Sequence, residues 1–154
     1  MIRSESEYRL AVDRIRQLRG QFAAREAELC EDGFAPDEIV RAMQPLLTFQ
    51  KQLEEEVACY ERLKRGDLSE FRDIGDFGFW LIGARIASGL SQRDLAQKLG
   101  VHESSVSRDE RNEYRGITLG RASQLAEVLG VGIRAEWRQV SHAASLLRNR
   151  EKIT

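Results

Sequence analysis

The chain has 154 residues, of which 42% are hydrophobic and 32% charged, a composition that can build a core for one or two small domains. No apolar run is long enough to span a membrane, and no apolar segment of a signal peptide follows the first five residues, so we expect a cytoplasmic protein. The formal net charge is −1, with 11 basic and 13 acidic side chains in residues 1–66 and 13 and 12 in residues 67–154. Nucleic-acid binding would therefore depend on where basic side chains lie and not on a global positive field.

The first 66 residues are predicted to form two long helices, over residues 4–31 and 37–65. Both carry apolar or small residues at alternating spacings of three and four, interrupted by Arg25 in the first helix and by Gln50 in the second, which is typical of a coiled-coil seam. The seam positions are Tyr8, Ala11, Ile15, Leu18, Phe22 and Leu29 on the first helix, and Ile39, Met43, Leu46, Gln50, Leu53, Val57 and Tyr60 on the second. When the chain folds back at Phe34, these positions meet, so we expect residues 1–66 to form an antiparallel helical hairpin that serves as an interaction module.

Local signals refine the two helices of this hairpin. Ser4 is a favourable N-cap, and Glu7 three residues later is expected to complete a capping box. Pro45 lies inside the second helix, where it removes one hydrogen bond and its ring collides with the preceding turn. We expect the second helix to kink at Pro45, or to restart there as a short helix followed by a long one.

The two cysteines lie at opposite ends of the predicted hairpin. Cys30 is beside the turn and Cys59 near the open end, so about 20 helical residues separate them by roughly 30 Å. A disulfide needs Cα atoms within about 7 Å, and we predict no intrachain disulfide. Two cysteines and two histidines, all far apart, fit no metal-site pattern, and we expect neither a metal nor a cofactor.

After a boundary at residues 65–69, residues 67–154 are predicted to form an all-α domain of five helices. The first runs from about residue 77 to residue 88. The second begins at the N-cap Ser91 and ends before Gly100, and His102 can cap the third, whose inward residue is Val106. Two short helices with glycine at their turn are typical of a helix-turn-helix. The fourth helix spans residues 118–129, and five of its apolar residues are expected to face inward, Leu119, Ala122, Leu125, Ala126 and Leu129. The fifth helix is expected over residues 134–150.

A gap-free pattern runs through about residues 77–131, roughly a third of the chain. It comprises Arg85-Ile86-Ala87-Ser88-Gly89-Leu90-Ser91-Gln92, Leu95-Ala96, Leu99-Gly100-Val101, Val106-Ser107-Arg108 and Glu110. This pattern resembles the XRE-type helix-turn-helix domain of lambdoid phage repressors. The resemblance implies that Gln92 contacts a DNA phosphate, and that Arg85 pairs with Glu110 to support the recognition helix.

The third helix of this domain carries the candidate DNA-reading residues. If Val106 points inward, a rotation of about 100° per residue turns Ser104, Arg108 and Arg111 outward, with Ser107 close by. Arg108 can make a bidentate contact to guanine, and Glu103 can accept from a cytosine amino group. Ser104 and Ser107 suit close or water-mediated contacts, whereas Arg111 and Arg115 are expected to contact phosphates and to position the domain.

Asp109 departs from the family pattern, which has a large apolar or aromatic residue at this place. Together with Glu110 it puts two carboxylates at a helix C-terminus, where they oppose the helix dipole. We expect Asp109 to turn to solvent or to pair with Arg111 or Arg115.

Three functions are compatible with these features. The start of the chain, Glu7-Tyr8-x-x-Ala11-x-x-x-Ile15-x-x-Leu18, with Cys59-Tyr60-Glu61 at the end of the second helix, is similar to HigA-type antitoxins. This similarity implies a ribonuclease toxin as partner and repression of the protein's own operon. The alternatives are a free-standing or phage-type repressor whose hairpin serves for dimerisation, and a protein-interaction adaptor that does not bind DNA.

Either repressor is expected to bind double-stranded DNA as a homodimer on an inverted repeat, with half-sites roughly 34 Å apart. The apolar residues off the hairpin seam, Val40, Leu47 and Phe49, are candidates for the dimer contact. The sequence contains no constellation of catalytic residues, so we expect no enzymatic activity.

Overall fold

The computed structural model describes residues 1–68 and 74–132, and across these ranges the protein is helical without a β-strand. The elements are α1 (Glu5–Glu31), α2 (Pro36–Lys64), the short 3-10 helix η1 (Ile74–Asp76), α3 (Phe77–Ala87), α4 (Gln92–Leu99), α5 (Glu103–Arg111) and α6 (Leu119–Leu129). The predicted all-α fold is confirmed. The last helix that the sequence predicts, over residues 134–150, lies outside the described residues. None of the described helices has the length and apolar character needed to cross a membrane.

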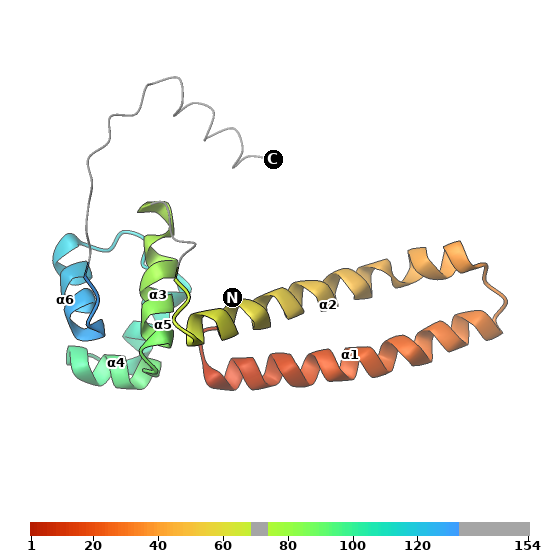
Figure 1. Ribbon diagram of the computed structural model, residues 1–154, viewed down its shortest axis with the longest axis horizontal. Helices are drawn as coiled ribbons and strands as arrows, with labels where there is room; N and C mark the ends of the chain where they lie inside the picture. Colours follow the sequence, from red (N-terminus) through yellow and green to blue (C-terminus); the bar gives the residue numbers. More distant parts are fainter. Residues whose placement is uncertain (69–73, 133–154) are drawn as a thin grey trace, which may run out of the picture.

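The two long helices α1 and α2 run side by side in opposite directions as a hairpin, closed by the turn at Phe34 (Figure 1). Every predicted seam residue is buried or half-buried, because the three-four spacing keeps one side of each helix against the other. Leu18, at 1% exposure, is the most enclosed of them. Cys30 and Cys59 are both free thiols.

The N-terminus of α1 differs slightly from the predicted capping box. The Ser4 hydroxyl accepts a hydrogen bond from the Glu7 amide at 3.2 Å, as a capping residue should. The Glu7 carboxylate, however, accepts from the Arg3 amide at 2.7 Å and not from Ser4. Arg3 is thus tied to the first turn of α1.

Pro45 lies within a continuous α2, so the predicted restart as a separate short helix is wrong. The proline removes the hydrogen bond that its own amide would have donated, yet the helix continues through it. Side chains before and after it, Met43 and Leu46, lie on the seam and keep both segments packed on α1. The Thr48 hydroxyl also donates to the Gln44 carbonyl at 2.9 Å, which adds a bond close to the interruption.

Residues 74–132 form a compact group of short helices around α3 (Figure 1). Helix α3 is apolar on most sides, and Leu81, Ile82 and Ala84 are almost fully enclosed because α2, α5 and α6 all pack against it. One predicted core residue of α6 is placed wrongly. Leu119 is 88% exposed, since it is the first residue of the helix and precedes the turn in which Ala122 reaches the core.

The hairpin and the helix-turn-helix region share one hydrophobic cluster. The open end of the hairpin, where the N-terminus also lies, abuts α3 (Figure 1). Ile2, only 4% exposed, belongs to the same cluster as Leu81 and Leu95, and so do Tyr60 and Leu63 from the end of α2. Helix α3 is therefore packed directly against the end of α2, and the hairpin and the group of short helices meet in one core.

Candidate DNA-binding surface

Local hydrogen bonds hold the start of α4 and the turn that joins α4 to α5. The Ser91 hydroxyl accepts from the Asp94 amide at 3.1 Å, and the Asp94 carboxylate accepts from the Ser91 amide at 2.9 Å. Donation by the hydroxyl and amide of Ser91 lowers the pKa of Asp94 below its usual value. Gly100 ends α4 in the left-handed region at φ 67°, and His102 Nδ1 accepts from the Ser104 amide at the start of α5. The predicted caps and the glycine turn are confirmed.

Helix α5 has one buried face and one open face. Val106 and Glu110 are enclosed at 1% and 0% exposure. The candidate DNA-reading residues lie on the remaining surface, and of them Glu103, Ser104, Arg108 and Arg111 are exposed and Ser107 is half-buried. Arg108 and Glu103 have no side-chain partner among the described residues, whereas the Nε of Arg111 donates to the Ser107 carbonyl at 3.3 Å. Arg108 is thus a cation on this face that is free to bind a ligand.

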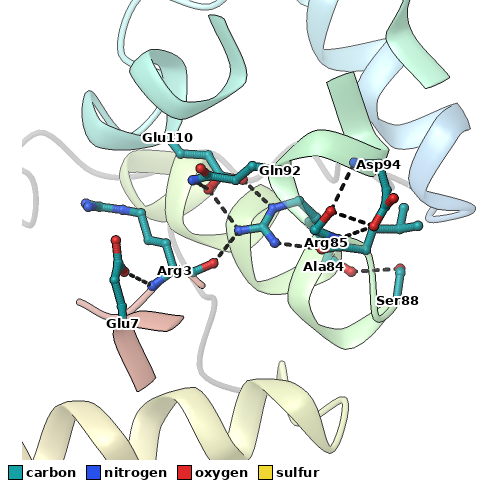
Figure 2. A network of polar contacts seen from close by, with 10 residues as sticks. Arg3, Glu7, Ala84, Arg85, Ser88, Gln92, Asp94 and Glu110 are labelled. Atoms are coloured by element: carbon teal, nitrogen blue, oxygen red, sulfur yellow. Dashed lines mark hydrogen bonds and ion pairs between the residues drawn. The ribbon is translucent and has the colours of Figure 1, made fainter. Parts of the chain in front are cut away.

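Glu110 is held from behind by Arg85 of α3 (Figure 2). The guanidinium Nη2 donates to Glu110 Oε2 at 2.8 Å, and Nε donates to Oε1 of the same carboxylate. Arg85 also donates to two main-chain carbonyls, that of Leu90 at 2.7 Å and that of Arg3 at 2.8 Å. Because both charges are buried, this bidentate pair fixes α5 to α3 in one orientation.

Gln92, the first residue of α4, belongs to the same network. Its Nε2 donates to Glu110 Oε2 at 2.7 Å, so the carboxylate accepts from side chains of two different helices (Figure 2). The side chain is half-buried, and the amide group keeps its second hydrogen for another acceptor. This arrangement orients Gln92 at the edge of α5.

The segment that follows α5 has an unusual backbone. Glu113 and Tyr114 both have positive φ, 51° and 52°, and the Tyr114 amide donates to the Asp109 carbonyl at 2.8 Å. Burial raises the pKa of Tyr114 well above its usual value. Gly78 of α3 makes room for this turn, because a Cβ there would lie 1.7 Å from the Glu113 carbonyl oxygen. Arg115 beyond the turn is exposed, with Nη2 3.3 Å from a Glu113 carboxylate oxygen.

Asp109 forms no ion pair with Arg111 or Arg115, the two partners that the sequence suggested. Its side chain is half-buried and has no partner among residues 1–68 and 74–132. Arg111 turns back to Ser107, and Arg115 lies beside Glu113. The Asp109 carboxylate therefore meets the unfavourable end of the helix dipole without a compensating cation.

The N-terminal residues Ile2 and Arg3 also belong to this region, although no sequence pattern predicts it. Ile2 enters the core of the helix-turn-helix, and the Arg3 carbonyl binds Arg85 across a separation of 82 residues. Neither residue has a signal in the sequence, because their role depends on how the hairpin folds back onto α3.

Comparison with known proteins adds one finding. A family model described as helix-turn-helix matches residues 82–135, which covers α4, α5 and α6 and most of α3. No curated protein and no solved structure matches the chain. The matched segment supports a DNA-binding transcription regulator, and double-stranded DNA is the partner that such a domain binds.

Proposed function

We propose that this protein is a sequence-specific repressor that reads an inverted-repeat operator with α5, and that it acts as the antitoxin of a toxin–antitoxin pair. Residues 67–154 would serve as the DNA-binding module and residues 1–66 as the interaction module. The observation that carries the DNA-reading part is the open face of α5, where Arg108 projects without an internal partner while Val106 and Glu110 anchor the opposite face.

The assignments on this face follow from chemistry and position. Arg108 reads guanine in the major groove through two parallel hydrogen bonds. Glu103 and Ser104 at the start of α5 reach deepest, where a carboxylate can accept from cytosine. Ser107 makes a close or water-mediated contact. Gln92, Arg111 and Arg115 bind phosphates on either side and set the register.

The hairpin supports the proposed role as an interaction module. It projects away from α4 and α5 (Figure 1). Three apolar side chains off its seam, Val40, Leu47 and Phe49, are between 45% and 59% exposed. Such residues are available to a protein partner. The antitoxin assignment itself rests on the similarity of the chain's start to HigA-type antitoxins.

The proposed DNA binding is tested in two steps. The protein first selects its preferred site from a random pool of duplex DNA, and its affinity for that site is then measured at several salt concentrations. Arg108→Ala should weaken binding to the selected site by roughly 1–3 kcal/mol and relax the preference at one base position. Arg14→Ala, on the exposed side of α1, is the matched control and should change neither. Binding without a sequence preference and without a salt slope would instead favour the adaptor.

The antitoxin part has its own test. Co-expression with the product of a neighbouring reading frame that encodes a small basic ribonuclease should yield a stable complex and relieve the ribonuclease's toxicity. If no such neighbour exists and the protein alone binds its operator, the free-standing repressor is the better description. In that case Val40→Glu combined with Leu47→Glu should reduce the fraction of dimer in solution, measured by light scattering.

A further inference from the structure

We propose that Arg3 of the hairpin is a further DNA-binding residue, which contacts a backbone phosphate beside the one assigned to Gln92. This inference rests on the proposed function, because it extends the surface of the same helix-turn-helix. It joins a residue at the extreme N-terminus to a surface that begins more than 80 residues later in the chain.

The main chain of Arg3 is fixed to the recognition helix. Its carbonyl accepts from Arg85 Nη2 at 2.8 Å, and Arg85 in turn holds Glu110 of α5. Its amide donates to the Glu7 carboxylate at 2.7 Å, and the neighbouring Ile2 is buried in the shared core. The main chain of Arg3 is therefore held on both sides, and its side chain leaves a backbone that is joined to α5 through Arg85.

The side chain of Arg3 lacks any internal acceptor. Figure 2 shows it extending away from the Arg85–Glu110 pair, with hydrogen bonds only from its main chain. Its Nε is buried without a hydrogen-bond partner, and the guanidinium forms no ion pair among the described residues. An outside oxygen acceptor can reach the terminal nitrogens of the guanidinium, which also have no partner among the described residues.

Arg3 lines a cavity of about 230 Å³ that also borders two of the residues proposed to contact DNA. Arg3 lines it together with Gln92 and Glu103, the first residues of α4 and α5, and with Glu5 and Lys64 from the ends of the hairpin. Three of the five charged side chains on its wall are already paired, since Lys64 Nζ lies 2.9 Å from a Glu5 carboxylate oxygen and Arg85 is paired with Glu110.

Two charges then remain without a partner on this wall, the Arg3 guanidinium and the Glu103 carboxylate. Glu103 is assigned to a base edge, which leaves Arg3 as the cation that faces the DNA backbone. A planar guanidinium matches the oxygens of a phosphodiester through two parallel hydrogen bonds. The hairpin would thus add directly to the DNA footprint and not only carry a protein partner.

The test measures how the affinity of the wild type and of Arg3 variants for a short mixed-sequence duplex depends on salt concentration. A mixed sequence suffices because a phosphate contact is independent of base sequence. Arg3→Ala should weaken binding about tenfold and reduce the slope of log K against log salt by about 0.9. Arg3→Lys keeps the charge and should keep the slope. Arg14→Ala, which removes one exposed arginine of α1, should match the wild type.

Thermal unfolding separates this role from a structural one. Because the contacts to Arg85 and Glu7 come from the main chain of residue 3, Arg3→Ala should melt at the wild-type temperature. If it melts earlier, Arg3→Gln, which keeps most of the side chain without its charge, must still reduce the slope at wild-type stability. An unchanged slope in both variants overturns the proposal, while absence of any salt-dependent binding by the wild type refutes the proposed function itself.

Discussion

Replacement of Glu110 by alanine should destabilise the protein more than any exposed substitution on α5. The carboxylate accepts hydrogen bonds from Arg85 Nε, Arg85 Nη2 and Gln92 Nε2, and it is fully buried. Without it, Arg85 keeps only its two main-chain acceptors and becomes a buried charge without a counter-ion. Breaking a buried ion pair in this way costs about 3–5 kcal/mol of the free energy of unfolding.

This loss is large for a chain of this size, whose total stability is of the order of 5–15 kcal/mol. We expect the melting temperature of Glu110→Ala to fall by roughly 10 °C. Urea unfolding followed by circular dichroism measures the free energy directly. Glu127→Ala, which removes an exposed carboxylate of α6, is the control and should change it by about 0.5 kcal/mol or less.

A double-mutant cycle decides whether the loss comes from the pair. Arg85→Met leaves Glu110 buried with only Gln92, so it should be destabilising too. In the double variant no charge is left unpaired, and its loss should be smaller than the sum of the two single losses by about 2 kcal/mol or more. Additive losses, or a loss below about 1 kcal/mol for Glu110→Ala, would refute the reasoning.

The other predictions concern the junction, the turn after α5 and the caps. Ile2→Ala should cost about 2–4 kcal/mol in urea unfolding and leave a single transition, because this side chain fills the shared core. Gly78→Ala should lower the melting temperature sharply, since its methyl group would collide with the Glu113 carbonyl oxygen; a tolerated alanine would contradict the close approach. Asp109→Leu should raise the melting temperature, and an unchanged or lower value would mean that its carboxylate is not unfavourable. The pKa of Asp94 is lowered in the folded protein. The stabilisation by its carboxylate is therefore present above the pKa of the unfolded state and is lost as the pH falls through the pKa of the folded state. The difference in melting temperature between wild type and Asp94→Asn should shrink between about pH 5 and about pH 3.

Much of the fold could be predicted because its signals are local. The three-four spacing from Tyr8 to Phe22 identified the seam of α1, and Ser91 with Asp94 identified the start of α4. These patterns depend on side chains one turn apart, and they act before any tertiary contact forms. Pro45 marks the limit of such reasoning, since its local penalty is offset by packing on α1, which the sequence alone does not reveal.

Other features of the surface depend on which elements meet. Leu119 has the spacing of a core residue, yet it is exposed because α6 begins there. The resemblance implied a phosphate contact for Gln92, but only the fold places its amide on Glu110. Such contacts join separate elements, and nothing in the periodicity of one helix specifies its neighbour's side chains.

The sequence by itself determined the helices, their caps, the seam of the hairpin and the outward direction of Ser104, Arg108 and Arg111, because the 3.6-residue repeat and the capping residues act over a single turn. The tertiary structure decided that the hairpin and the helix-turn-helix share one core, and that the Arg3 carbonyl reaches Arg85. The physical reason is the distance along the chain. The buried guanidinium of Arg85 needs hydrogen-bond acceptors in place of water. One of them is the Arg3 carbonyl, which comes near Arg85 only when the chain has folded.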